Sequence, residues 1–298
     1  MASIAQHLTA QPSVLYRKNR LFYMAYDLPW LAGILATIGV MVAVGWPGLI
    51  PAVAPQWEPW MWALLPATFY VHVLMNVTVH NCCHGNLPRS INRLVGEVFG
   101  VLVLTRYASW EIIHQRHHRY SDDPERDPHH VLPNFWVFLA RTMLINVESQ
   151  LQQIQYDQFG DTPGHRRYEK LRAVVSFGTM VVLLAAYFMF LGPDLFLRIF
   201  VPTQALGWLV VAHFNWATHN AHDPNGDYHP VNLDHGLYWI GNRIWFGLYM
   251  HGNHHKRANV FNPLRMEQVL ARRAAARAAR GQGPELDPDD EHADRPAA

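Results

Sequence analysis

Residues 61–84 read MWALLPATFYVHVLMNVTVHNCCH, an apolar run that leads directly into two histidines, His80 and His84. A helix needs about 20 mostly apolar residues to cross the hydrocarbon core of a bilayer, and Met61–Val79 is close to that length. On a helix, residues four apart lie on one face, so both imidazoles can point toward the same ion. The stretch therefore predicts a membrane-spanning helix whose end carries candidate metal ligands.

Three other apolar stretches approach the length of a membrane span. They cover residues 24–50, 173–191 and 195–214. Charged residues make up only 16% of the chain, against about 25% in soluble domains. The mean hydropathy of -0.06 nevertheless requires a large polar part. The sequence thus predicts an all-α integral membrane protein with four transmembrane helices, and places the shorter apolar runs Leu94–Leu104 and Phe135–Ile145 in interfacial or buried helices.

The distribution of basic residues predicts the orientation of these helices. Of the 24 lysines and arginines, eleven lie between residues 81 and 172 and nine follow residue 214, whereas residues 45–59 contain none. Lysine and arginine are enriched in cytoplasmic loops, so both termini and the long middle loop are expected in the cytoplasm. The chain is therefore predicted to be a multi-pass protein whose histidine clusters all lie on the cytoplasmic side.

Three more histidine clusters follow the first one along the chain. They are His114-Gln-Arg-His117-His118, Asn215-Trp-Ala-Thr-His219 and His251-Gly-Asn-His254-His255. A single HxxxH pair is a weak signal of metal binding, but two copies of HxxHH on the same predicted side are improbable by chance. One metal site is therefore expected to draw on His80, His84, His114, His117, His118, Asn215, His219, His251, His254 and His255.

The number of imidazoles indicates more than one ion. Imidazole suits iron, copper and zinc, and nine donors are too many for any single ion that must keep a position open. Divided between two ions they give four or five ligands each, which leaves room for dioxygen. A closed structural zinc site needs only four ligands, often including cysteine. The pattern therefore favours a pair of redox-active metal ions.

The order and spacing of the clusters resemble those of the membrane fatty-acid desaturase and hydroxylase superfamily. Its three histidine boxes correspond here to HNCCH at His80–His84, HQRHH at His114–His118 and HGNHH at His251–His255. The NxxxH element at Asn215–His219 is similar to one in stearoyl-CoA desaturases. The resemblance implies four transmembrane helices under a cytosolic helical cap that holds two iron ions, with dioxygen as co-substrate. The third box departs from the HNxHH of many acyl desaturases, which leaves the substrate open.

An acidic stretch follows the second box. Asp122, Asp123 and Asp127 are candidates for orienting the imidazoles from behind, because metal-bound histidines commonly donate to carboxylates. A solvated turn is an equally good interpretation of the same residues. His129 and His130 come next and could lie near the metal site or on the surface of the cap.

A polar stripe precedes His80 within the second predicted span. His72 and Asn76 precede it at intervals of four residues, so the stripe leads from within the bilayer to the metal site. Buried polar groups in a membrane usually face a cavity or a partner. We expect His72 and Asn76 to line a substrate tunnel, with hydrogen bonding between helices as the alternative.

The resemblance implies an oxidoreductase that oxidises a fatty acyl or similar lipid chain, and desaturation is the leading expectation. Hydroxylation, ketolation and decarboxylation of a fatty acid to a terminal alkene use the same scaffold, so they remain alternatives. The sequence has no HPGG haem-binding segment, flavin fingerprint or iron–sulfur cysteine pattern. Electrons are therefore expected from an external donor such as ferredoxin or rubredoxin with a reductase. A metal transporter, whose ligands would cross the bilayer, and a zinc hydrolase, which needs about three ligands, are remote alternatives.

Charge and composition along the chain bound the other possibilities. The net charge of +1 gives no general attraction to nucleic acid. Residues 1–271 are predicted to form one membrane-embedded catalytic domain. Residues 272–298 begin basic and alanine-rich and end acidic with several prolines, so they are expected to form a polar, disordered tail.

Overall fold

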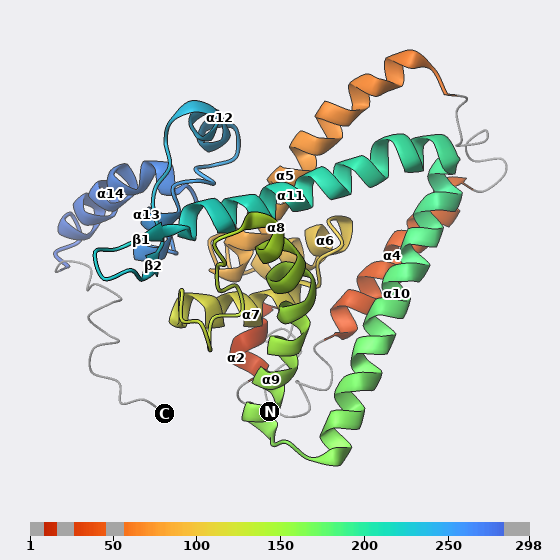
Figure 1. The fold of residues 1–298 in the computed structure, drawn as a ribbon. Coiled ribbons are helices and arrows are strands. Elements are labelled where there is room, and N and C mark those ends of the chain that lie inside the picture. The colour runs from red at the N-terminus through yellow and green to blue at the C-terminus, as the bar shows by residue number, and fades with distance from the viewer. Residues whose placement is uncertain (1–8, 17–26, 46–56, 283–298) are drawn as a thin grey trace.

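The computed structural model describes residues 9–16, 27–45 and 57–282, and Figure 1 shows that they are mostly helical. The elements η1 and η4 are 3-10 helices, and η2 and η3 are π-helical. In chain order the elements are α2 (Pro12–Tyr16), α4 (Leu28–Gly45), η1 (Pro59–Ala63), α5 (Leu64–Cys83), α6 (Asn92–Leu102), α7 (Tyr107–Arg119), α8 (Phe135–Val137), η2 (Phe138–Asn146), α9 (Val147–Phe159), α10 (Pro163–Leu195), η3 (Phe196–Phe200), α11 (Val201–His219), β1 (Ala221–His222), β2 (Tyr228–His229), α12 (Gly236–Ile244), α13 (His251–Lys256), η4 (Pro263–Arg265) and α14 (Met266–Ala278).

Three helical stretches among the described residues are long and apolar enough to cross a membrane. They are Leu28–Gly45, Pro59–Cys83 and Pro163–His219. The first lies within the predicted span 24–50, whose ends at residues 24–26 and 46–50 lie outside the described residues. The second contains the predicted span 61–79, and the third contains both 173–191 and 195–214. The predicted all-α membrane class is therefore confirmed, with three candidate spanning stretches.

The stretch Pro163–His219 bends sharply in its second half. Gly192 has φ 74° and ψ 164°, a conformation that glycine adopts more readily than any other residue. Pro193 follows it and has no backbone N–H, so it cannot donate a helical hydrogen bond to the preceding turn. Figure 1 shows α10 and α11 leaving this bend in different directions. With 33 residues, α10 is about 50 Å long. It therefore exceeds a hydrocarbon core of about 30 Å, and its polar first part, residues 163–172, extends beyond the apolar part.

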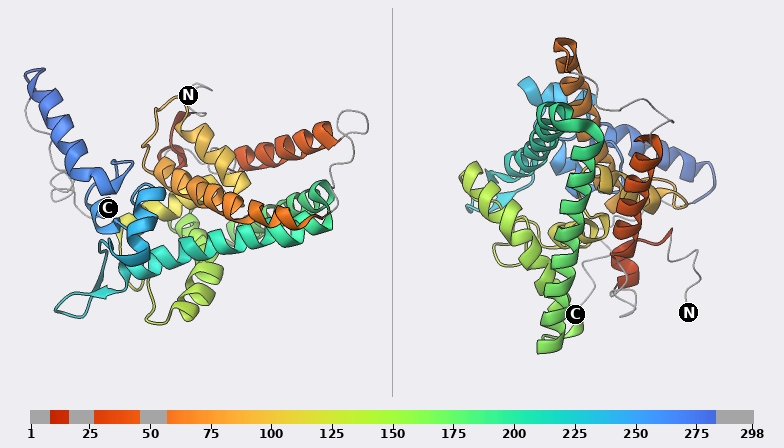
Figure 2. Two further views of the ribbon diagram at one scale, coloured as in Figure 1. Left: turned by 90° about the horizontal axis from the view of Figure 1, so that it is seen from above. Right: turned by 90° about the vertical axis from the view of Figure 1, so that its right-hand side faces the viewer.

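The helix α5 lies at the centre of the fold. It packs against α6, α7 and α11, while α4 packs against α10. Figures 1 and 2 show α5 and α11 converging toward the end of the molecule where α13 lies. Trp30 and Ile34 of α4 are buried in an apolar cluster with Val101 and Leu183. The helices are thus joined by apolar side chains, as burial of apolar surface requires.

The C-terminal end of α5 is fixed by contacts with α6 and α7. Tyr107 is fully buried, and its hydroxyl donates to the carbonyl oxygen of Cys82 at 2.8 Å. Asn92 donates to the same carbonyl at 2.8 Å. Gly96 lets α6 approach closely, because a Cβ there would lie 2.6 Å from the Tyr107 ring. These contacts set the position of His80 and of the second histidine box relative to each other.

The chain after α11 returns to cover the same end of the fold. The short hairpin β1–β2 pairs Ala221 with His229. The Val231 amide donates to the Thr218 carbonyl at 2.7 Å, which holds the segment before α13 against the end of α11. The last helix among the described residues, α14, includes the first residues of the predicted tail 272–298, and residues 283–298 lie outside the described part of the chain.

Candidate metal centre

The nine box histidines come together where α5, α7, α11 and α13 meet. They form two groups in which one ring nitrogen of each residue lies within 4.8 Å of those of the others. Each group draws on residues that are far apart in the sequence, so neither exists until the helices have assembled. The first group is His80, His84, His114, His118 and His254, and the second is His117, His219, His251 and His255.

The ring nitrogens within each group are placed to bind an ion. Three pairs of Nε2 atoms face each other closely: His84 and His114 at 2.8 Å, His118 and His254 at 3.0 Å, and His251 and His255 at 3.2 Å. The Nε2 atoms of His80, His117 and His219 are buried without a hydrogen-bond partner among the described residues. Unpaired buried nitrogens are costly, and a bound cation would satisfy them. Each group could therefore hold one metal ion, and the all-imidazole donor set fits iron.

Two of the three candidate aspartates lie directly behind box histidines. Asp127 accepts from Nδ1 of His117 at 2.8 Å, and Asp122 lies 3.0 Å from Nδ1 of His219. The Asp122 amide also donates to Asp127 at 2.7 Å, which couples the two carboxylates. With Nδ1 held by a carboxylate, the Nε2 atom of each ring is left available to bind a metal ion. Asp123 instead accepts from the amides of residues 125 and 126 in its own loop.

Burial keeps most of these imidazoles neutral. Burial, reinforced by the neighbouring histidines, lowers the pKa of each of the following side chains well below its usual value: His84, His114, His118, His251, His254 and His255. For His117, burial also opposes the charged form, but the Asp127 carboxylate outweighs it and raises the pKa. Neutral imidazole is the form that binds a metal, so six of the nine ligand candidates need release no proton near neutral pH.

Asn215 lies one helical turn before His219 on α11. Its side chain is buried, and its Nδ2 donates to the Val211 carbonyl at 3.0 Å. The amide nitrogen is thereby used within the helix, which leaves the amide oxygen as the atom suited to a metal ion or its water. A role for Asn215 as a ligand stays a prediction.

His129 is a further histidine at the centre that is buried and belongs to no box. Its ring lies 5.3 Å from that of His117 and 5.0 Å from that of Trp110, measured between centroids. Neither ring nitrogen has a hydrogen-bond partner within the described part of the chain, and burial lowers the pKa of His129 to about 3. The sequence did not decide whether His129 lies near the metal site or on the surface of the cap. Its position two residues after Asp127 is the signal that could have placed it near the site.

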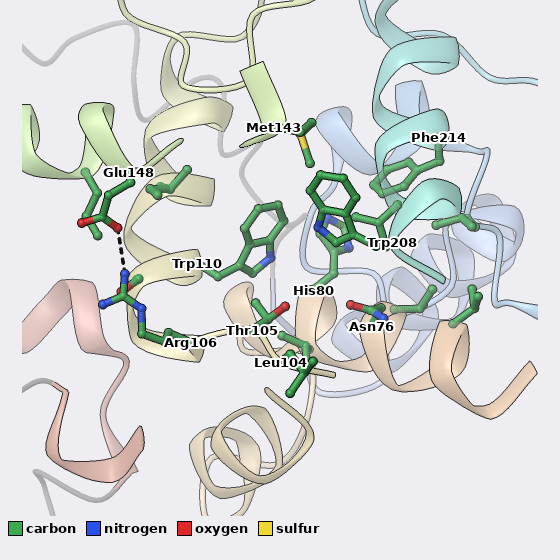
Figure 3. Close-up of a pocket in the computed structure, with 18 of the residues that line it drawn as sticks. Asn76, His80, Leu104, Thr105, Arg106, Trp110, Met143, Glu148, Trp208 and Phe214 are labelled. Atoms are coloured by element: carbon green, nitrogen blue, oxygen red, sulfur yellow. Dashed lines mark hydrogen bonds and ion pairs between the residues drawn. The ribbon is translucent and has the colours of Figure 1, made fainter. Parts of the chain in front are cut away.

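A cavity of about 300 Å³ adjoins the first histidine group. Its wall includes His80 and Asn76 of α5, together with the aromatic side chains of Trp110, Trp208 and Phe214. Figure 3 shows His80 and Asn76 on one side of the cavity and Phe214 and Trp208 close by. Largely apolar cavities of this size are typical of small-molecule sites. The wall of this cavity therefore places a metal-ligand candidate beside space that suits a hydrocarbon chain.

The two predicted tunnel residues occupy different surroundings. Asn76 lines the cavity, and its Nδ2 donates to the His72 carbonyl at 3.0 Å. His72 is buried against Gly207 of α11, where an added Cβ would lie 1.9 Å from its ring. This position between α5 and α11 agrees with the alternative prediction, in which His72 contacts a neighbouring helix.

Comparison with known proteins identifies the family. The profile described as fatty acid desaturase matches residues 55–263, a segment that contains all nine box histidines. The chain belongs to the fatty acid desaturase family. The resemblance based on the histidine boxes is thereby confirmed.

Two curated relatives carry the same name. The chain is 29% identical over 204 residues to the sn-1 oleoyl-lipid 12-desaturase of Arthrospira platensis, with 60% of this chain and 53% of that protein covered. It is 32% identical over 74 residues to the sn-1 oleoyl-lipid 12-desaturase of a Picosynechococcus strain, with 23% of this chain and 21% of that protein covered. The chain thus spans about half the length of the first of these desaturases. No solved structure matches it.

Proposed function

We propose that this member of the fatty acid desaturase family is a membrane-bound, non-haem di-iron enzyme that uses dioxygen to desaturate a fatty acyl chain. The observation that carries the proposal is that His80 belongs both to the first histidine group and to the wall of the apolar cavity. A methylene group of a chain in that cavity would lie beside the metal-binding nitrogens. The names of the two curated relatives agree with this chemistry.

The residues of the site would contribute orientation and a dry environment. Two iron ions held by the two groups would supply the oxidation that removes hydrogen from an unactivated methylene. Asp122 and Asp127 would hold their imidazoles in the ligating orientation. The rings of Trp110, Trp208 and Phe214 would exclude water and restrict the bound chain to few conformations.

The proposal includes four membrane crossings with the histidines and both termini in the cytoplasm. The bend at Gly192 supports it, because it divides Pro163–His219 into two arms that could each cross a bilayer. The excess of lysine and arginine in residues 81–172 and after residue 214 supports the orientation. An external donor such as a ferredoxin or rubredoxin with its reductase would deliver the electrons.

Hydroxylation is the nearest alternative, since it differs only in the fate of the oxidised carbon. Decarboxylation would require a substrate carboxylate near the irons. The two charged side chains that line the described cavity, Arg106 and Glu148, are separated from His80 by Trp110 (Figure 3). A zinc hydrolase would need about three ligands and would leave most of the nine histidines without a role.

The proposal is tested by lipid analysis of a host that expresses the chain, together with the iron content of the purified protein. We expect new double bonds and two irons per chain in the wild type, with the double bonds lost in His254→Ala. His235→Ala is the matched control, because His235 is exposed and belongs to neither group. Hydroxylated lipid or a terminal alkene in place of double bonds would contradict desaturation, and protein without bound iron would contradict the di-iron centre.

A further inference from the structure

Residues 9–16, here called the α2 segment, lie against the helices that carry the first two histidine boxes. The helix within this segment, α2, packs against α7, and Figure 1 shows the two close together. Gln11 contacts the end of α5, and Ser13 contacts α7. These contacts join residues that are 71 and 98 positions apart in the chain, so they form only when the helices have assembled.

Gln11 bridges the end of α5 and the start of α7. Its Nε2 donates to the Cys82 carbonyl at 2.6 Å. Cys82 lies between His80 and His84 in the last turn of α5, where backbone carbonyls lack a helical N–H partner. Oε1 of Gln11 lies 2.7 Å from the hydroxyl of Tyr107, the first residue of α7. One amide side chain thereby holds the first histidine box against the helix that carries the second.

Ser13 holds α7 through a buried carboxyl group. The amide and the hydroxyl of Ser13 donate to the two side-chain oxygens of Glu111, at 2.8 and 2.6 Å. Glu111 is fully buried and lies three residues before His114, so both residues lie on the same face of α7. A buried carboxyl group that loses its hydrogen bonds is costly. Ser13 therefore resists a shift of the helical turn that leads to His114.

Both contacts act on the first histidine group. The Nε2 atoms of His84 and His114 lie 2.8 Å apart within it, where α5 and α7 meet. Metal–ligand distances tolerate deviations of only about 0.2 Å, so a small shift between these helices changes how the two imidazoles meet an ion. The second group depends less on this junction, since three of its four members, His219, His251 and His255, come from α11 and α13.

We propose that Gln11 and Ser13 are positioning residues for the metal centre. They fix the first two histidine boxes relative to each other and so set the affinity of the first group for its ion. The inference rests on the proposed function, because it takes each group to bind one iron. It predicts that loss of either contact weakens one of two metal sites, whereas a contact that only stabilises the fold would affect both sites alike or neither.

Titration of the purified full-length protein with ferrous ion, without oxygen and in competition with a chelator, tests this assignment. We expect two binding steps in the wild type. His80→Ala identifies the step of the first group, because His80 belongs to that group alone. Gln11→Met removes the amide at similar volume, and Ser13→Ala removes the hydroxyl. Each should weaken the first-group step about tenfold, the lower limit for losing a group that contacts a ligand directly, and leave the other step nearly unchanged.

Ser13→Thr keeps a hydroxyl and should retain the affinity of the wild type. Gln153→Met is the matched control, because Gln153 is exposed and pairs with Asp157 within α9. Thermal unfolding of each metal-free variant verifies that it is folded, and if one variant does not fold, the other decides. Equal weakening of both steps, or of neither, would overturn the inference. A wild type that binds two ions but forms no double bonds would contradict the proposed function alone, whereas one that binds no ion would contradict both.

Discussion

The aspartates behind the second histidine box differ in what their carboxylates contact. Asp127 is buried and accepts from His117 at 2.8 Å, whereas Asp123 is partly exposed and caps the amides of its own loop. The His117 imidazole holds the pKa of Asp127 at about 2 despite burial, which acts in the other direction. The two residues are four apart in sequence and both acidic, so only their contacts distinguish the carboxylate that lies behind a ligand candidate from the one that caps loop amides.

This difference predicts unequal effects on metal binding. Asp127→Asn removes the carboxylate behind His117, and we expect it to weaken metal affinity by about 10–100-fold, the usual effect of losing such a partner. Asp123→Asn is the matched control and should leave affinity nearly unchanged. Competition of the purified proteins against a chelator of known affinity measures both. Equal losses in the two variants would contradict the assigned role of Asp127.

Asn76 lies in the cavity wall, so the size of its side chain should affect which acyl chains fit. Asn76→Phe places a larger apolar side chain in the cavity wall, so the space beside His80 shrinks and shorter acyl chains should be favoured. Val71→Phe is the control on the same helix, because Val71 is 46% exposed and lies outside the cavity wall. The measurement is the distribution of product chain lengths. An unchanged distribution in Asn76→Phe would show that the cavity does not hold the acyl chain.

Among the elements, α5 and α11 approach each other closely. Gly207 on α11 faces His72 on α5 so closely that an added Cβ would lie 1.9 Å from the imidazole ring. Nearby, the hydroxyls of Thr68 and Thr203 lie 2.7 Å apart between the same helices. Small and polar residues at such an interface are typical of helices that pack within a membrane. Because α5 carries His80 and α11 carries His219, this contact also positions ligand candidates of both groups.

Gly207→Ala is therefore expected to destabilise the protein. The added methyl must displace His72 or part the helices, at a cost of about 1–3 kcal/mol for overpacking. Gly178→Ala, in α10, meets no atom within 4 Å and is the matched control. It should be neutral or slightly stabilising, since alanine favours a helix more than glycine does. Thermal unfolding in detergent compares the two, and an equal midpoint for both variants would contradict the close approach.

At the scale of the whole molecule, the two histidine groups join four segments that are otherwise separate in the chain. The first group links α5, α7 and α13, and the second links α7, α11 and α13. An ion in each group would therefore connect the transmembrane helices to the C-terminal segment that covers them. Removing the ions leaves several buried imidazoles crowded together without a ligand.

Metal removal is accordingly expected to lower stability and loosen α13. Saturation at 100 times the dissociation constant stabilises a folded protein by about 2.7 kcal/mol per site. A chelator should lower the midpoint of thermal unfolding, and added ferrous ion should restore it. Hydrogen exchange at residues 251–256 should rise in the metal-free protein and fall on reconstitution. Identical exchange in both states would contradict the structural role of the ions. His235→Ala, outside both groups, should respond to the chelator as the wild type does.

Two properties of this protein could be determined from its sequence alone, because both are local. The length and apolar composition of Met61–Val79 indicate a membrane-spanning segment. The spacing of four residues between His80 and His84 places both side chains on one face of a helix. The family and the nine candidate histidines follow from such patterns.

Only the tertiary structure divides those histidines into a group of five and a group of four. Each group combines residues of α7 and α13 with others that are far away in the chain. The same holds for the burial of His129, the packing of His72 on Gly207 and the pairing of Arg106 with Glu148. These depend on how helices approach one another in space, and no local spacing encodes that approach.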